Sequence, residues 1–356
     1  MQRLAKRHTK PYSSVINFNS KVTMSKLLKA IAGGLLLAAT ALPVSAATLK
    51  IASLAPDGST WMNEMRAAGE RIDAATEGRV KVKFYPGGVM GNDTTVLRKI
   101  RLGQLQGAAL TGSELSILYK DAQIYSVPFL FRDDAEVDAI RKVVDPMLRE
   151  GFTAKGFHVL SITGVGFAYL MSVPDVRSKT DLQKGKVWVP QNDTIAEITF
   201  REGGVEPIPL PLSDAFTGLQ TGLIDTVATT PTAAIALQWH TKLKHLVDMP
   251  LSYVVGYVML DQKAYMKLSE ADRAAVDAEF AKGAANIDAA NRSDNQKAFE
   301  ALQEIGLKVF KPDAEEAALW RDVGKRALDK LVADKAFTAP VLGAIEGQLA
   351  KQRAAE

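Results

Sequence analysis

The sequence predicts an α/β protein made of two lobes, with the chain crossing between them. Three observations favour this class. Strand-like and helix-like segments alternate after residue 46, the pattern restarts at Gly156, and no long flexible linker separates the two parts. We therefore expect two mixed, mainly parallel sheets flanked by helices, with interleaved crossings, instead of two independent domains on a linker.

The first 46 residues have the features of an export signal. From Met24, two lysines precede an apolar run of 13 residues, Ala30 to Leu42, and small residues before Ala46 form a cleavage site. The run is shorter than the roughly 20 residues of a membrane span. We expect residues 1–46 to be a leader and signal peptide that is cleaved near Ala46. About 310 residues then remain, enough for two domains.

Charge and cysteine content exclude several classes of protein. The leader holds seven basic and no acidic residues, so the formal net charge of +4 becomes −3 once it is removed. A mildly acidic chain has no bulk attraction for nucleic acid or anionic lipid. The absence of cysteine excludes disulfides, thiolate metal sites and cysteine nucleophiles.

The first part of the exported chain indicates the order strand, helix, strand, helix, strand, which implies a mainly parallel sheet. The expected elements are a strand at 49–54, a helix capped by Ser59 or Thr60, a strand in RVKVKFYP, a helix from Asn92 or Asp93 to Gly103, and a strand at 107–111. Ligands of such sheets bind beyond the carboxyl ends of the strands. We expect the strand-end residues Leu54 and Thr111 to face a binding site.

The second part continues the alternation and ends in helices. The expected elements are two strands in GFHVLSITGVGFAYLMSV, a strand at 186–189, a strand in VEPIPLP, a helix capped by Ser213, a strand that runs into Thr229 and Thr230, and a long apolar strand in SYVVGYVMLDQKAY. The last strand is long enough to bridge both sheets. From Ser269 to its end the chain is expected to be helical.

Known catalytic motifs are absent. The exported part has three histidines, His158, His240 and His245, and none lies in an HExxH setting. The chain has no GxSxG elbow or Walker loop, and the glycine-rich stretch GGVMGN lacks the lysine that a phosphate loop needs. We expect a protein without enzymatic activity, metal site or cofactor.

Four stretches resemble one family of transport proteins. YSVPFLFRDD, KGKVWVPQND, LSDAFTGLQTGLID and LDQKAYMKLSEADRAAV occur in the order and spacing typical of the solute-binding proteins of tripartite ATP-independent periplasmic (TRAP) transporters, over residues 48 to 335. The resemblance implies a periplasmic protein of the two-lobed binding-protein fold, braced by a long helix. Its lobes close on a small ligand, and it delivers that ligand to a TRAP membrane permease. A monomer is expected.

The resemblance also implies where the lobes divide. Lobe I comprises residues 47–166 and 254–293, and lobe II comprises 167–253 and 294–356 with the C-terminal helices. A sensory binding protein that is read by a receptor would share all these features and remains an alternative. An ABC-transporter binding protein is disfavoured by the spacing of PFLFR and LQTGLID.

The chain departs from its relatives where they hold the ligand. Most members have Lys-x-Arg-Val-Pro, and this arginine clamps the ligand's carboxylate, but Trp188 stands in its place here. A second basic position of the family falls on Ala168 or Tyr169, and a polar Asn-Pro corresponds to Thr230-Pro231. The resemblance thus predicts a ligand site at Trp188 that lacks the usual salt bridge.

Two interpretations of this site remain open. In the first, which the family's ligands favour, an organic acid is held by hydroxyls and backbone amides or by a relocated Arg201. In the second, a neutral, aromatic or cationic ligand stacks on Trp188, Tyr169 or Trp239. Packing in a core is the simpler interpretation for the two tryptophans. Glu114 could serve a cationic ligand, but it is interpreted as an exposed loop acid. The candidate contact residues are Leu54, Thr111, Ser113, Phe129, Ala168, Tyr169, Trp188, Thr229, Thr230 and Trp239.

Overall fold

A mixed sheet of eight strands runs through the part of the chain that the computed structural model describes, residues 46–354. The leader predicted up to the cleavage site near Ala46 lies outside the described residues. The strands are β1 (Ala47–Ser53), β2 (Val80–Tyr85), β3 (Gly107–Thr111), β4 (Phe157–Ser172), β7 (Thr226–Thr229), β8 (His245–Val247), β9 (Ser252–Asp261) and β10 (Lys308–Phe310), and a separate pair is formed by β5 (Trp188–Pro190) and β6 (Ile208–Leu210). Their order is β10-β8-β4-β9-β3-β1-β2, with β7 also paired to β4.

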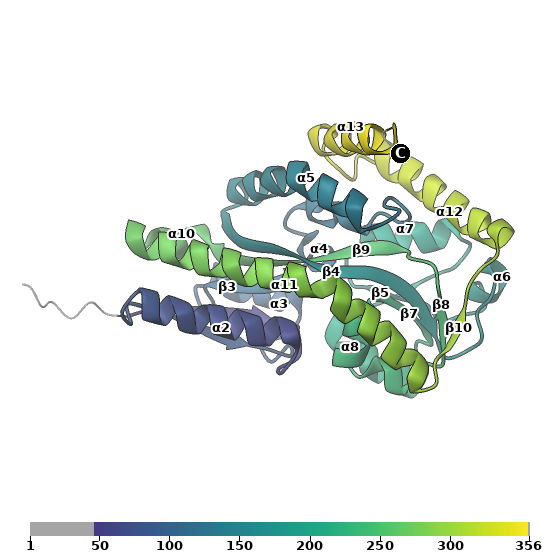
Figure 1. Ribbon diagram of the computed structural model, residues 1–356, viewed down its shortest axis with the longest axis horizontal. Coiled ribbons are helices and arrows are strands. Elements are labelled where there is room, and N and C mark those ends of the chain that lie inside the picture. Colours follow the sequence, from purple (N-terminus) through teal and green to yellow (C-terminus); the bar gives the residue numbers. More distant parts are fainter. Residues whose placement is uncertain (1–45, 355–356) are drawn as a thin grey trace, which may run out of the picture. The chain divides into compact units, whose positions relative to one another are not determined.

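Helices pack against this sheet (Figure 1). They are α2 (Thr60–Ala75), α3 (Asp93–Arg101), α4 (Gly112–Leu115), α5 (Asp134–Ala154), α6 (Lys179–Leu182), α7 (Thr194–Glu202), α8 (Leu212–Thr221), α9 (Pro231–Ala236), α10 (Gln262–Met266), α11 (Glu270–Glu304), α12 (Ala314–Ala333) and α13 (Ala339–Ala354), with 3-10 turns η1 (Lys120–Ser126) and η2 (Trp239–Thr241). Among the described residues, no helix is long and apolar enough to cross a membrane.

The starts of three helices follow the local sequence. The sequence left open Ser59 or Thr60 and Asn92 or Asp93, and the structure shows Ser59 and Asn92 as the caps, while the start at Ser269 is confirmed. The side chains of Ser59, Asn92 and Ser269 accept hydrogen bonds from backbone N–H groups in the first turns of α2, α3 and α11. The predicted cap Ser213 is wrong. The N-cap of helix α8 lies two residues earlier, at Pro211, so the helix begins at Leu212, and the Ser213 hydroxyl donates instead to Asp214.

Two strands cross between the halves of the sheet. In the first half, β1 pairs in parallel with β2 and β3, and β3 pairs antiparallel with β9. The long apolar strand β9 also pairs with β4 from Phe157 to Ala168. Among the described residues it pairs with no strand beyond β4, so the bridge predicted for β9 is made by β4. The far end of β4 then pairs with β7 and β8 in the other half.

The prediction of two strands in residues 157–172 is wrong. They form the single strand β4, whose register against β9 shifts between Val159 and Ser161 and again between Gly164 and Gly166. Gly166 has a φ of +119°, a conformation that glycine adopts readily. Gly164 and Gly166 therefore mark a bulge inside β4, and the strand continues beyond them.

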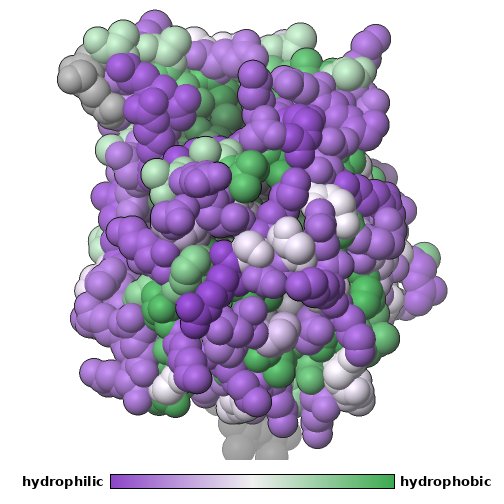
Figure 2. Space-filling view, turned by 90° about the vertical axis from the view of Figure 1, so that its right-hand side faces the viewer, coloured by the Kyte–Doolittle hydropathy of each residue, from purple (hydrophilic) through white to green (hydrophobic). Residues whose placement is uncertain are grey.

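Long helices brace the two ends of this arrangement. Helix α11 packs against β4 and α2, while α12 packs against α7 and α13 packs against α5. The α13 side chains Val341, Ile345 and Leu349 are buried in the same apolar cluster as residues of α5 and β9. The face seen in Figure 2 is mostly hydrophilic, with apolar residues scattered among polar ones.

Candidate ligand-binding cavity

A cavity of about 1020 Å³ opens where β1 and β3 end. These parallel neighbours present their carboxyl ends at one edge of the sheet. The other walls are the start of α2, the crossing strands at Gly164 and Gly256, helix α9 and one face of α11. The volume suits a small organic molecule.

Two of the ten candidate contact residues lie on the wall of the cavity. Leu54 follows β1 directly and Thr111 is the last residue of β3, as the strand-end argument requires. Most of the other lining residues were not predicted as ligand contacts. They include Asn63 and Glu64 of α2, Thr232, Ala233 and Leu237 in and after α9, and Asn286, Asn291, Asp294 and Lys297 of α11.

Trp188 is not on this wall. Its side chain is buried, 4% exposed, in an apolar cluster with Ala215 and Leu219 of α8. The ring meets that of Trp239 edge to face, with centroids 5.1 Å apart, and its Nε1 donates to the carbonyl oxygen of Leu210 at 3.1 Å. In this arrangement both tryptophans have the environment of core residues, the simpler of the interpretations that the sequence left open.

Three further candidates, Ala168, Tyr169 and Phe129, also contact other parts of the protein. Ala168 is buried, and its carbonyl oxygen accepts from the backbone N–H of Leu251. Tyr169 packs edge to face on Phe299 of α11, with ring centroids 5.6 Å apart. Phe129 is half-buried at a φ of +54° and packs in the cluster that contains Trp320 of α12.

Three hydroxyl candidates are buried away from the cavity, and two of them bond to other protein groups. Thr229 is buried at the end of β7, and Thr230 caps α9 by accepting from the N–H of Ala233. Ser113 is buried, and its Oγ donates to Oδ2 of Asp193 at 2.5 Å. None of these three residues lines the cavity. The proposed substitute Arg201 lies elsewhere, exposed on α7 and paired with Glu206.

The charged groups on the wall are mostly acidic. Lys297 is the only basic side chain among the lining residues in the described part of the chain. Asp57 is paired with Arg66 at 2.8 Å, and Glu64 with Arg71 at 3.0 Å. The remaining acidic residues on the wall are Glu114 and Asp294.

Glu114 is buried, so its interpretation as an exposed loop acid is wrong. It is 5% exposed and stands in the first turn of α4, where its Oε2 accepts from the backbone N–H of Thr111 at 2.7 Å. Burial raises the pKa of Glu114 to about 7, with a further contribution from the negative charge of Asp93, against the lowering by the Thr111 hydrogen bond. A capping residue that the sequence placed in a loop is thus a desolvated acid on the cavity wall.

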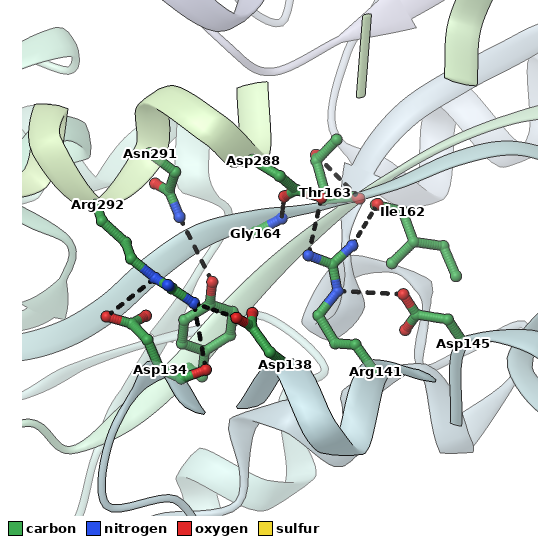
Figure 3. A network of polar contacts seen from close by, with 12 residues as sticks. Asp134, Asp138, Arg141, Asp145, Ile162, Thr163, Gly164, Asp288, Asn291 and Arg292 are labelled. Atoms are coloured by element: carbon green, nitrogen blue, oxygen red, sulfur yellow. Dashed lines mark hydrogen bonds and ion pairs between the residues drawn. The ribbon is translucent and has the colours of Figure 1, made fainter. Parts of the chain in front are cut away.

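The crossing strands behind the cavity are held by a polar network (Figure 3). Arg141 of α5 donates to the carbonyl oxygen of Ile162 at 2.7 Å and to Asp288 of α11 at 2.9 Å, and it pairs with Asp145 at 3.1 Å. The other oxygen of Asp288 accepts from the N–H of Gly164 at 2.7 Å. Burial lowers the pKa of Arg141, but Asp145 and Asp288 raise it above the ordinary value. The guanidinium therefore stays charged and ties two helices to the cavity floor.

Two α/β halves, two crossing strands and a cavity at the strand ends define a two-lobed binding protein. Residues 51–335 match the model of the DctP family, bacterial extracellular solute-binding protein family 7, and the chain belongs to that family. The TRAP resemblance inferred from the four sequence stretches is thereby confirmed.

Similar proteins come from several bacteria. The C4-dicarboxylate-binding periplasmic protein DctP of Rhodobacter capsulatus is 24% identical over 261 residues, 71% of this chain and 77% of that protein. The 2,3-diketo-L-gulonate-binding periplasmic protein YiaO of Escherichia coli is 26% identical over 287 residues, 77% of this chain and 84% of that protein.

Solved structures confirm the two-lobed fold. A TRAP periplasmic solute-binding protein from Desulfovibrio salexigens, with bound orotic acid, aligns with a TM-score of 0.79 at 19% identity, covering 86% of this chain and 99% of that one. The sugar acid binding protein DctPAm from Advenella mimigardefordensis, in complex with galactonate, aligns with a TM-score of 0.79 at 20% identity, covering 85% of this chain and 99% of that one.

Proposed function

We propose that this solute-binding protein captures a small organic acid in the cavity at the strand ends and delivers it to a TRAP membrane permease. The cavity of about 1020 Å³ is the observation that carries the proposal. The names of the similar proteins support the acid, since they include a C4-dicarboxylate-binding protein and one structure with succinate. The chain is a binding component without catalytic activity, and it works as a monomer.

The periplasm is the proposed location. The family is extracellular, and the two relatives above are named periplasmic proteins. Export requires the leader, with cleavage near Ala46. The formal net charge of −3 after cleavage speaks against nucleic acid as a partner.

The acid is held without an arginine on the cavity wall. Lys297 supplies the positive charge, and helix α2 begins at the wall with Thr60 and Trp61, where the N-terminal end of a helix favours an anion. A ligand stacked on Trp188 or Trp239 is less favoured, because both rings are buried against each other.

The lobes that close on the ligand are residues 47–166 with 254–293, and 167–253 with 294–356. The crossing strands β4 and β9 support a hinge between them, since both halves of the sheet share β4. The packing of α13 on α5 attaches the last part of the second lobe's chain to the first lobe.

A thermal-shift screen of purified residues 47–356 tests the proposal. Dicarboxylates, sugar acids and aromatic acids are compared with neutral aromatics and quaternary amines. We expect an organic acid to raise the melting temperature, because a ligand at 100 times its Kd stabilises the native state by about 2.7 kcal/mol. Stabilisation by neutral aromatics alone would reject the organic acid as ligand.

A further inference from the structure

Within residues 46–354, Glu114 is the only buried acid among the carboxyl-bearing residues that line the cavity. The residue is 5% exposed, while Asp57 is exposed and Glu64 and Asp294 are half-buried. Asp57 and Glu64 are neutralised by arginines. Glu114 receives only the Thr111 backbone N–H and hydroxyl as favourable partners.

The groups around Glu114 add to the cost of its charge. Asp93, at the start of α3, repels the ionised form. Asp193, the N-cap of α7, is buried and bonds to Ser113, the residue next to Glu114. An ionised carboxylate that is buried without a cation loses several kcal/mol of solvation. A positively charged or hydrogen-bond-donating group of the ligand would offset this cost.

A separate positive charge faces the same cavity from α11. Lys297 makes no ion pair within 4.0 Å to a carboxylate of the described residues, and it is exposed at the wall. Its ammonium group is available to a ligand carboxylate. The cavity therefore offers an acidic group that lacks a cation and a basic group that lacks an anion.

On the basis of the organic-acid function above, we propose that the ligand also carries a protonated amine, so that it is an amino-acid-like zwitterion. The amine binds the Glu114 carboxylate, and Lys297 holds the acid group. Glu114 is then the residue that distinguishes an amino acid from the corresponding acid without the amine.

Proton release upon binding is a consequence of this assignment. With a pKa of about 7, the Glu114 carboxyl is roughly half protonated in the free protein at pH 7. An ammonium group beside it favours the ionised form and lowers its pKa. Binding at pH 7 therefore releases a fraction of a proton. A carboxylate placed at Glu114 would cause proton uptake instead.

Matched ligand pairs test the inference by titration calorimetry. The pairs are propionate and β-alanine, pentanoate and 5-aminovalerate, succinate and aspartate, and glutarate and glutamate, so that only the amine differs within each pair. We expect at least one amine-bearing member to bind tenfold or more tightly than its partner. Titrations in buffers of different ionisation enthalpy should show proton release for that ligand.

The variant Glu114→Gln separates recognition from folding. Glutamine keeps an oxygen to accept from Thr111 N–H but carries no charge, and we expect it to reduce the preference for the amine at least tenfold. Glu77→Gln, an exposed acid paired with Arg79, is the matched control and should retain the preference. Circular dichroism and the melting temperature of each free variant report on folding.

The possible outcomes distinguish this inference from the proposed function. If the acids without an amine bind as tightly as their partners, the zwitterion is wrong and the organic-acid function stands. If Glu114→Gln keeps the preference for the amine, the assignment of the amine to Glu114 is wrong. If binding takes up protons, the amine is not at Glu114. If neither these compounds nor the acids of the wider screen bind, the organic-acid function itself is rejected.

Discussion

The family motif predicts Trp188 at the ligand site, but in the structure its side chain is buried in an apolar cluster. Its ring is 4% exposed, stacks edge to face on Trp239 and donates to the carbonyl oxygen of Leu210. We expect Trp188→Ala to lower the free energy of unfolding by about 3–5 kcal/mol, the range for truncating a core aromatic residue. Urea denaturation of the free protein measures this, and Trp188→Phe should lose less. Unchanged stability with loss of ligand binding would instead favour a ring that contacts the ligand.

Glu114 makes stability depend on pH in a defined direction. Its pKa of about 7 in the folded protein is above the ordinary 4.5, so the folded state binds the proton more tightly than the unfolded state. The group stabilises the fold fully below pH 4.5, and this contribution is lost as pH rises through 7. Relative to Glu114→Gln, we expect the wild type to lose up to about 3 kcal/mol between pH 4.5 and 8. If the free energies of unfolding of the two proteins change with pH by the same amount, Glu114 does not titrate as a buried acid.

At the scale of elements, local signals were sufficient for three helix starts, failed at Ser213 and were insufficient for strand continuity. Ser59, Asn92 and Ser269 cap helices through hydrogen bonds to residues three positions away, which the sequence contains. The stretch that holds Gly164 and Gly166 was expected to form two strands. Their place in the continuous β4 is fixed by pairing with β9, some 90 residues later along the chain, which no local pattern encodes.

The bulge in β4 depends on Gly166. A Cβ atom there would lie 2.5 Å from Nδ2 of Asn295, which donates to the carbonyl oxygen of Val165, and the φ of +119° disfavours any other residue. We expect Gly166→Ala to destabilise the protein by at least about 1–3 kcal/mol. Gly343→Ala on α13, where the added atom meets nothing within 4 Å, should be neutral or stabilising. Chemical denaturation of both variants decides whether the bulge is required.

At the scale of the whole molecule, the sequence located the strand ends but not the opposite wall of the cavity. Leu54 and Thr111 follow from the topology of a parallel sheet. Asp294 and Lys297 belong to a 35-residue charged helix, whose cavity-facing side is set by packing against β4 and α2. The family motif placed Trp188 in register with the missing arginine, but which side of the short strand β5 the ring occupies depends on α8 and η2.

The proposed lobes also touch beside the cavity through buried polar contacts. Ser113 donates to Asp193, and Ser116 donates to the carbonyl oxygen of Asn192 at 3.0 Å. Burial raises the pKa of Asp193, while hydrogen bonds from the Ala196 N–H and the Ser113 hydroxyl lower it. If the lobes open at the β4 and β9 crossing, water replaces Ser113 as the partner of Asp193. The serine hydroxyl therefore stabilises the arrangement in which the proposed lobes touch, called the closed form below.

Removing this hydroxyl should shift the molecule toward an open state. In Ser113→Ala, the closed form retains Asp193 with one hydrogen bond fewer, which costs about 1–3 kcal/mol, whereas an open form would hydrate the carboxylate. We expect ligand affinity to fall about 5- to 100-fold through faster dissociation, and the radius of gyration of the free protein to increase in small-angle X-ray scattering. Thr153→Ala, which removes an exposed hydroxyl bonded within α5, is the control and should change neither quantity. If Ser113→Ala and the wild type have equal ligand affinity and an equal radius of gyration, the contact between Ser113 and Asp193 does not stabilise the closed form.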